Sequence, residues 1–536
     1  MPEKKSPVPG VVLLLLAFVG MALHAPLVAA ALNEPAAPLP LMEPEDPLLE
    51  PVKPEAPTGE PAPATPVGQS ETPRAPATDA EPSGTIRVPY IPGPVKEQLK
   101  KELEESLRKE VVEEVVRQAR KEHWGVPDAW PEWVQRLTFG GDIRLRAQDD
   151  SYAGTNAIYV DPQKTNNERS LQLLNTTEDR ERLRTRLRFG VQANIIRSEL
   201  DAGFRLATGS SSDPVSTNQT LGSTNRPYSI FLDRAFLAWR SRNNVWNAWG
   251  GRMPNPWFGT DLVWDEDLAF DGVALKVNPL RDLTESSPDF DPFLTLGVFP
   301  LQEVELSQKD KWLYGAQAGF NARLGGSSKM VFAVAYYDYR NIEGERNSPG
   351  SSLLDHTAPQ FLQKGNTLFN IADPSSGQTL LGLASDFNEL NLTASIANYS
   401  FAPTHIILTL DYVKNRGFDE RKILQRINGE SAAFPFLNRD VDASQIKLTV
   451  GRPVVERQGE WQVSFAYKKI GGNAVLDAFT DSDFHLGGTD ARGWILGGAY
   501  GLALDTWLSV RFISTDEIKG APLGIDSLQI DLNAKF

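Results

Sequence analysis

The sequence predicts an all-β transmembrane antiparallel β-barrel of about sixteen strands, preceded by a disordered Pro-rich linker and a periplasmic α-helix. Two observations lead to this fold class. From residue 137 onward, polar and apolar residues alternate in successive segments, as in strands with one polar and one apolar face. The connections between these segments are long and short in turn, which is the asymmetry of outer-membrane barrels.

The composition narrows the function classes. The chain has 536 residues, a net charge of −15 and no cysteine. The negative charge argues against nucleic acid as a partner, and the lack of cysteine removes disulfides and thiolate catalysis. The five histidines show no spacing typical of a metal site, so we expect neither a metal ion nor a cofactor. The hydrophobic content of 41% fits a barrel, because only alternate barrel residues face lipid.

Residues 1–30 are expected to be a signal peptide. Lys4 and Lys5 precede an apolar run at 11–23, and small residues follow at 29–31. The run is shorter than the roughly 20 residues that a spanning helix needs, and no later segment has such a run. An exported protein that spans a membrane without a helix has to be a barrel. We therefore expect the outer membrane of a Gram-negative bacterium, with the N-terminal region in the periplasm.

Residues 31–94 are rich in Pro, Ala and Glu and are expected to form a disordered linker, because this composition cannot bury a core. At about 3.1 Å per residue, such a linker could span on the order of 100–200 Å. It is either a passive spacer or a tether to peptidoglycan or another envelope partner.

Residues 95–123 are expected to form one helix, because prolines precede them and Gly125 and Pro127 follow. Apolar residues recur every four positions from Leu99 to Ala119, with charged residues on the other faces. This narrow stripe is typical of a short coiled coil. The helix is either the oligomerisation stalk of a homo-oligomer, for example a trimer, or a single helix packed on the barrel rim.

Residues 137–536 are expected to form the barrel. Alternation is clearest at 182–195, where four arginines share one strand face and Leu183, Leu187 and Phe189 share the other. We expect sixteen strands, because a barrel with both ends in the periplasm needs an even number. They are residues 137–147, 182–195, 199–208, 228–240, 244–252, 269–278, 292–301, 312–324, 329–340, 386–400, 404–415, 440–452, 459–469, 491–504, 505–515 and 525–536.

The last strand ends on Phe536, which is also the last residue of the sequence. It resembles the closing strand of bacterial outer-membrane barrels, in which the final aromatic residue serves as an assembly signal. This resemblance implies recognition of Phe536 by the barrel assembly machinery.

Two further stretches carry a wider resemblance. One is residues 137–147, LTFGGDIRLRA, and the other runs from Gly251 through WDEDL at 264–268 to Ala274. Over residues 95–536 the chain resembles the putative porin family of Gram-negative outer-membrane proteins. The resemblance implies a transport barrel and supplies no binding residues.

The polar faces of the first three strands predict a basic wall in the lumen. Charges that faced lipid would each cost about 2–4 kcal/mol at mid-membrane, so these arginines should line the pore. They are Arg144 and Arg146 on the first strand, Arg182, Arg184, Arg186 and Arg188 on the second, and Arg205 on the third. If the loop at 253–268 folds inward, its acidic group would form a constriction opposite them. This group is Asp261, Asp265, Glu266, Asp267 and Asp271. The alternative leaves the loop outside and the arginines solvated.

We therefore expect an outer-membrane porin, a passive diffusion channel for small hydrophilic solutes or ions, in which the arginines favour anions. The alternative is a structural tether that links the outer membrane to the cell wall through the linker and helix. An enzyme is not expected, because no serine lies at a spacing from the barrel histidines that would indicate a nucleophile and its base. Expected partners are outer-membrane lipid, small solutes and further copies of the chain.

Overall fold

The computed structural model describes residues 133–281, 289–305 and 307–536. The predicted signal peptide at 1–30, the linker at 31–94 and the helix at 95–123 lie outside the described residues. Within the described ranges, no helix is both long and apolar enough to cross a membrane.

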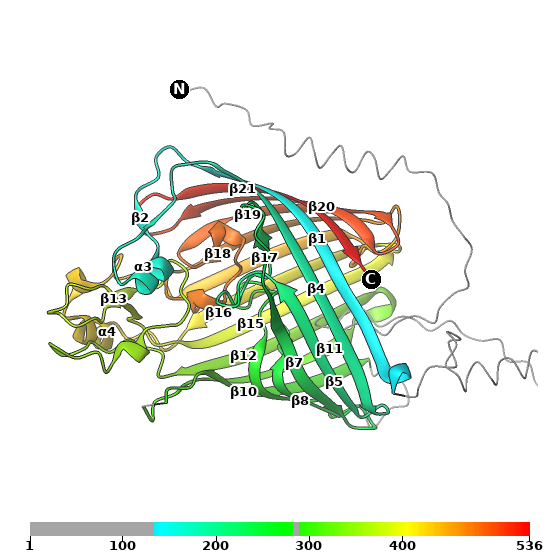
Figure 1. The fold of residues 1–536 in the computed structure, drawn as a ribbon. Helices are drawn as coiled ribbons and strands as arrows, with labels where there is room; N and C mark the ends of the chain where they lie inside the picture. Colours follow the sequence, from blue (N-terminus) through cyan, green and yellow to red (C-terminus); the bar gives the residue numbers. More distant parts are fainter. Residues whose placement is uncertain (1–132, 282–288, 306) are drawn as a thin grey trace, which may run out of the picture. The chain divides into compact units, whose positions relative to one another are not determined.

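Sixteen antiparallel strands form a closed ring (Figure 1). Each strand pairs with the next along the chain, and β21 pairs back with β1. The strands are β1 Leu137–Tyr152, β4 Arg180–Ile196, β5 Leu200–Thr208, β7 Ile230–Arg240, β8 Trp246–Met253, β9 Phe270–Val277, β10 Phe290–Gln302, β11 Lys311–Arg323, β12 Ser328–Arg340, β15 Asn388–Phe401, β16 Thr404–Asn415, β17 Asp442–Gly451, β18 Trp461–Ile470, β19 Ala491–Ala503, β20 Thr506–Glu517 and β21 Gly524–Lys535. The predicted barrel of sixteen strands is confirmed, because each expected segment overlaps one strand of the ring.

The structure also has elements that the alternation did not predict. β1 continues to Tyr152, five residues beyond the expected end. In the described residues, the connections carry the short strands β2 Tyr159–Val160, β3 Leu173–Leu174, β6 Gln219–Thr220, β13 Leu368–Asn370 and β14 Leu381–Leu383, and the helices α3 Pro162–Glu168 and α4 Glu420–Ile427. Elements of two or three residues show no period, so a sequence pattern cannot reveal them.

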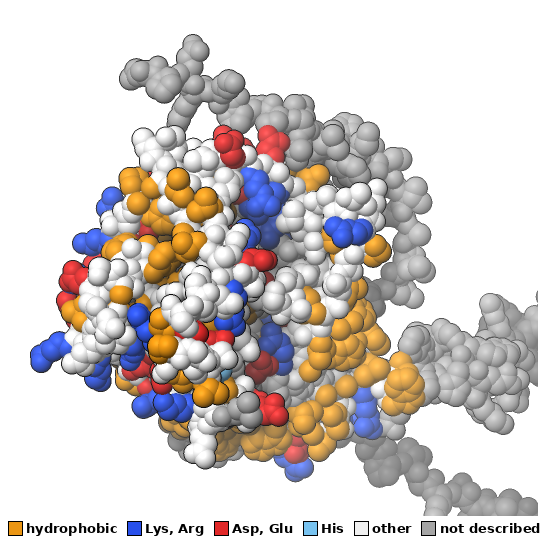
Figure 2. All heavy atoms as spheres, turned by 60° about the vertical axis from the view of Figure 1, so that its left-hand side comes forward, with side chains coloured by type: hydrophobic (Ala, Val, Ile, Leu, Met, Phe, Trp, Pro, Cys, Tyr) orange, Lys and Arg blue, Asp and Glu red, His pale blue; other side chains and the backbone are white. Residues whose placement is uncertain are grey.

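Side chains of the ring alternate between an apolar outer face and an interior face. On β10, Leu294, Leu296 and Val298 are about two-fifths exposed, whereas Thr295 and Phe299 are buried. Hydrophobic side chains dominate the right-hand flank of the barrel in Figure 2, while charged side chains of both signs lie on the loop-bearing end nearer the viewer. The outer face is therefore suited to lipid.

The connections differ in length between the two ends of the barrel (Figure 1). One end carries the long loops 153–179, 209–229, 254–269, 341–387, 416–441 and 471–490, as expected, together with the shorter connections 303–310 and 518–523. The other end carries turns, such as 197–199 and 402–403. Several long loops pack on each other: Phe369 and Ile371 form a buried cluster with Ile423 and Ile427 of α4.

The largest apolar cluster lies where loop 254–269 packs against interior side chains of the barrel. The Trp257 ring packs edge-on against Phe299 and Tyr337, with ring centroids 6.0 and 5.3 Å apart. Glycines make room for it, because a Cβ atom added to Gly315 would lie 2.5 Å from the Trp257 ring. Loop 254–269 therefore folds into the barrel and packs on interior side chains that leave room for the Trp257 ring.

The barrel closes at the seam between β1 and the C-terminal residue. Gly141 N donates to Phe536 O at 2.9 Å, and Phe536 N donates to Gly141 O at 3.1 Å. The Phe536 ring covers Gly141, since an added Cβ would lie 2.7 Å from it. The terminal residue thus pairs with β1 through its main chain and packs on it through its ring.

Candidate constriction

The seven predicted arginines form one surface on the interior face of β1, β4 and β5, which we call the arginine wall. Strand pairing places Arg144 opposite Arg186 and Arg146 opposite Arg184. The intervening side chains Ile143 and Leu145 are about two-fifths exposed on the outer face, whereas Arg146 is only 1% exposed. The alternation therefore predicted correctly which side chains share a face.

Carboxylates on neighbouring strands compensate most of the wall. Asp142 accepts from Arg186 at 2.7 Å and from Arg188 at 2.6 Å. Asp531 on β21 pairs with Arg146 at 2.7 Å. Two further pairs are Arg182 with Asp150 and Arg205 with Asp233. Sequence reasoning placed Asp142 and Asp531 on polar strand faces without pairing them with the arginines, and it did not single out Asp150 or Asp233.

Loop 254–269 is fastened to the opposite part of the barrel interior. Phe258 N donates to Gln317 Oε1 at 2.9 Å, and Gln317 Nε2 donates back to Phe258 O at 2.6 Å. Thr260 Oγ1 donates to the buried Asp411 at 2.6 Å. These bonds from β11 and β16 hold the loop inside the ring.

This loop brings Asp267 to the arginine wall. Asp267 Oδ1 lies 3.3 Å from Arg188 Nη1 and 3.7 Å from Arg186 Nη1. Its other oxygen accepts from the main chain and hydroxyl of Thr217, at 3.1 and 2.9 Å. Of the acidic group in the sequence, Asp267 is the member that meets the wall directly.

The other members of that group lie elsewhere. Asp261 pairs with Lys468 of β18 at 3.1 Å, Asp265 accepts from Ser482 N at 2.9 Å, and Glu266 is exposed. Asp271 does not face the arginine wall, contrary to the expectation. It lies on β9, where strand pairing sets it opposite Arg252, and the two form an ion pair at 2.9 Å.

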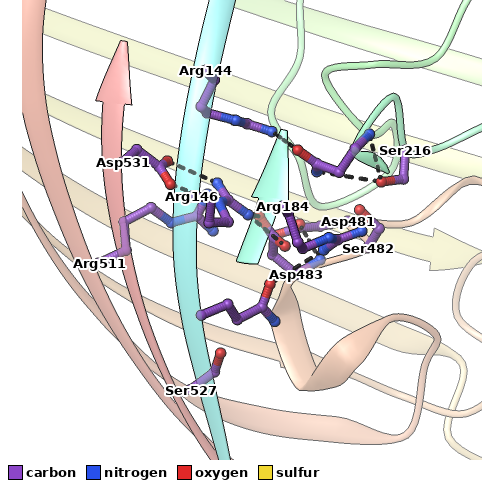
Figure 3. A network of polar contacts seen from close by, with 12 residues as sticks. Arg144, Arg146, Arg184, Ser216, Asp481, Ser482, Asp483, Arg511, Ser527 and Asp531 are labelled. Carbon is purple, nitrogen blue, oxygen red and sulfur yellow. Dashed lines mark hydrogen bonds and ion pairs between the residues drawn. The ribbon is translucent and has the colours of Figure 1, made fainter. Parts of the chain in front are cut away.

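A second loop, 471–490, also reaches the wall and was missed by sequence reasoning. Asp483 pairs with Arg146 at 2.9 Å and with Arg511 of β20 at 3.3 Å. Figure 3 shows Arg146 and Arg511 directed toward Asp483 from two strands. The only local signal was the run Asp481-Ser482-Asp483 within a long connection.

The two loops are joined to each other. Asp265 N donates to Phe479 O at 2.8 Å, and Lys468 lies between Asp261 and Asp481 at 3.1 and 3.2 Å. Loops 254–269 and 471–490 therefore form one acidic surface, which we call the loop pair.

The loop carboxylates have contrasting proton affinities. Burial alone would raise the pKa of Asp267, but Arg186, Arg188 and Arg144 hold that pKa below its usual range. Burial acts likewise on Asp483, and Arg146 and Arg511 hold its pKa low. Burial, with the neighbouring charges of Asp267 and Asp481, raises the pKa of Asp265 well above the usual value. Asp265 is therefore one of several acids of the loop pair with a raised pKa, because burial also raises the pKa of Asp477, Asp481 and Asp490.

A cavity of about 250 Å³ lies beside the wall, at the end that carries the short turns. Its lining includes Asp142, Arg186, Arg188, Trp507, Lys535 and residues 453–455 of the turn between β17 and β18. The wall thus borders open space as well as the loop pair.

A family model described as "Putative porin" matches residues 53–536. The chain belongs to the putative porin family. For this porin, family and fold together indicate a channel in the outer membrane rather than an enzyme, with the apolar outer face in lipid.

Three solved structures that resemble this porin are distant from it in sequence. OprB of Pseudomonas putida at high pH is 10% identical, with a TM-score of 0.45 over 77% of this chain and 97% of that chain. OmpF of Salmonella typhi in complex with daunomycin is 9% identical, with a TM-score of 0.40 over 75% and 97%. The outer membrane channel DcaP of Acinetobacter baumannii is 9% identical, with a TM-score of 0.38 over 75% and 97%. No curated protein matches the sequence.

Proposed function

We propose that this porin is a passive diffusion channel for small hydrophilic solutes, with its constriction where the loop pair meets the arginine wall. The observation that carries the proposal is the set of ion pairs from Arg146 and Arg188 on the wall to Asp483 and Asp267 on the loops. Fixed charges on both sides of a narrow passage control which ions enter it.

The charge balance supports a preference for anions. Among the described residues, six carboxylates form ion pairs with the arginine wall and with Arg511: Asp142, Asp150, Asp233, Asp267, Asp483 and Asp531. The seven arginines of the wall and Arg511 exceed these carboxylates by two positive charges. This local surplus, rather than the net charge of −15, acts on a solute in the passage.

The test is the reversal potential of the refolded protein in a planar bilayer with a KCl gradient. We expect the wild type to favour chloride and the double variant Arg184→Glu with Arg186→Glu to lose or invert that preference. Heat-modifiable migration of both proteins controls for folding. The same ion preference in both would overturn the proposed constriction.

We also propose an orientation and roles for the ends of the chain. The long loops face the exterior, and the short turns and the N-terminal region face the periplasm. The composition of 31–94 and the stripe in 95–123 support a spacer and an oligomerisation stalk, with peptidoglycan as a further contact. The seam between Gly141 and Phe536 supports Phe536 as the signal for the barrel assembly machinery.

The structural tether remains the alternative function, through the same linker and helix. As the sole function, it predicts that loss of residues 31–123 weakens the envelope and that the intact chain passes no solute. The channel proposal predicts solute flux whether or not these residues are present.

A further inference from the structure

Two arginines of the wall differ from the other five. Arg144 donates to Asn218 Oδ1, and Arg184 Nη1 donates to Gln148 Oε1 at 3.2 Å. Across residues 133–281, 289–305 and 307–536, neither guanidinium lies within ion-pair distance of a carboxylate, whereas Arg146, Arg182, Arg186, Arg188 and Arg205 all do. Arg144 and Arg184 therefore account for the surplus of two charges.

Both side chains also keep an unused donor. The Nε atoms of Arg144 and Arg184 are buried, and within the described part of the chain neither has a hydrogen-bond partner. A buried polar group without a partner costs free energy, and a charged group costs more. Amide oxygens orient the two side chains without neutralising them, so the positive charge stays available.

The two arginines are neighbours on the same face. Because Arg144 pairs with Arg186 and Arg146 pairs with Arg184, Arg144 and Arg184 are diagonal neighbours across β1 and β4. Diagonal positions lie about 7–8 Å apart, within the reach of long side chains. Figure 3 shows both side chains on the interior side of the β1 ribbon, Arg144 toward Ser216 and Arg184 toward Ser482 and Asp483.

We propose that Arg144 and Arg184 form a binding site for the carboxylate or phosphate group of an anionic solute in transit. The inference rests on the proposed channel function and adds a substrate class, solutes that carry an oxyanion group. Planar guanidinium groups match the geometry of such oxygens and form charge-assisted hydrogen bonds with them. A bound oxyanion accepts hydrogen bonds from the terminal guanidinium nitrogens and supplies the missing countercharge as well, whereas chloride lacks the planar oxygens that match the guanidinium fork.

Asp267 and Asp483 border the site through the neighbouring arginines 186, 188 and 146. Their negative charges oppose a second anionic group nearby and keep the bound group from being held too tightly to leave. Conduction requires binding that is favourable but weak enough for release.

The test measures single-channel chloride current in KCl while inorganic phosphate or acetate is added at constant ionic strength. We expect both to reduce the current in a saturable way in the wild type. The variants Arg144→Gln and Arg184→Gln should each raise the half-blocking concentration by about tenfold or more. Each variant loses one charge-assisted hydrogen bond to the blocking anion, and a loss of that size weakens binding by this factor.

Arg205→Gln is the matched control, because it removes the same charge from the wall at an arginine that is paired with Asp233. It should lower chloride preference but leave the half-blocking concentration within about twofold. Arg144→Lys and Arg184→Lys keep the charge and lose the planar guanidinium. Their half-blocking concentrations should therefore lie between those of the wild type and the glutamine variants. If a glutamine variant does not fold, the lysine variant is used in its place.

The outcomes separate the two proposals. A conducting channel whose current is not blocked by phosphate or acetate, or is blocked equally in wild type and Arg184→Gln, overturns the site while leaving the channel in place. A folded barrel that conducts no ions overturns the channel function itself, and the site with it.

Discussion

Replacing Lys468 with methionine should release the loop pair from the barrel interior. The Lys468 side chain is fully buried on β18, and its ammonium group lies between Asp261 and Asp481, one from each loop. It also lies 4.9 Å from the centre of the Phe484 ring. Methionine fills a similar volume without the charge, so both carboxylates would remain buried without a cation.

The size of the effect follows from the two contacts. At an effective dielectric constant of about 20, a pair of charges near 3 Å interacts by about 5 kcal/mol, and part of this offsets the cost of burying Lys468. Breaking a buried ion pair typically costs about 3–5 kcal/mol. The equilibrium between docked and released loops should therefore shift by about a hundredfold or more. The ring keeps its strand pairing, so the barrel should persist.

The assay is single-channel recording of Lys468→Met beside the wild type, with heat-modifiable migration as the check on the barrel. We expect larger and noisier conductance with weaker ion selectivity. Adding Asp481→Asn to Lys468→Met should restore part of the wild-type behaviour, because one uncompensated charge is removed. Lys414→Met is the matched control, since Lys414 and Asp442 form a half-exposed pair at 3.3 Å that contributes little. Wild-type conductance and noise in a folded Lys468→Met channel would refute the role of Lys468 as the tie between the loops.

Three further predictions follow. Deletion of Phe536 should sharply reduce barrel assembly, because Gly141 then loses two main-chain hydrogen bonds and the ring that covers it; normal outer-membrane levels of the truncated chain, measured by fractionation, would contradict this. Removal of residues 31–123 should weaken the oligomer and leave the barrel's circular dichroism unchanged, and an unaltered crosslinking ladder would argue against the stalk. Asp265 has a raised pKa, so it binds a proton more readily in the folded than in the unfolded state. Lowering the pH through the raised pKa of Asp265 should therefore stabilise the loop pair and strengthen anion preference, as the reversal potential would report. Asp265→Asn should reduce this pH response, and the raised pKa values of Asp477, Asp481 and Asp490 account for what remains.

The strand pattern could be predicted from the sequence because it is local. Arg182, Arg184, Arg186 and Arg188 share a face of β4 through the two-residue period of any strand, whatever that strand pairs with. The same period marked the sixteen strands and the apolar outer face. Loop lengths then distinguished the two ends of the barrel.

The carboxylates that compensate the positive charge of the arginine wall could not be identified from the sequence, because they come from distant segments. Asp531 meets Arg146 across 385 positions of sequence, and Asp483 meets it across 337. Asp271 illustrates the converse, because it is close in sequence to Asp267 but pairs with Arg252 once β9 adds to β8.

The sequence by itself thus determined the barrel, the approximate number and bounds of its strands, and the existence of a basic interior face, because each depends on residues next to one another in one strand. Only the tertiary structure decided which loops fold inward and which arginines keep a free charge. Those outcomes depend on strand register and on packing between distant segments, such as Trp257 in the space above Gly315, and no local pattern encodes them.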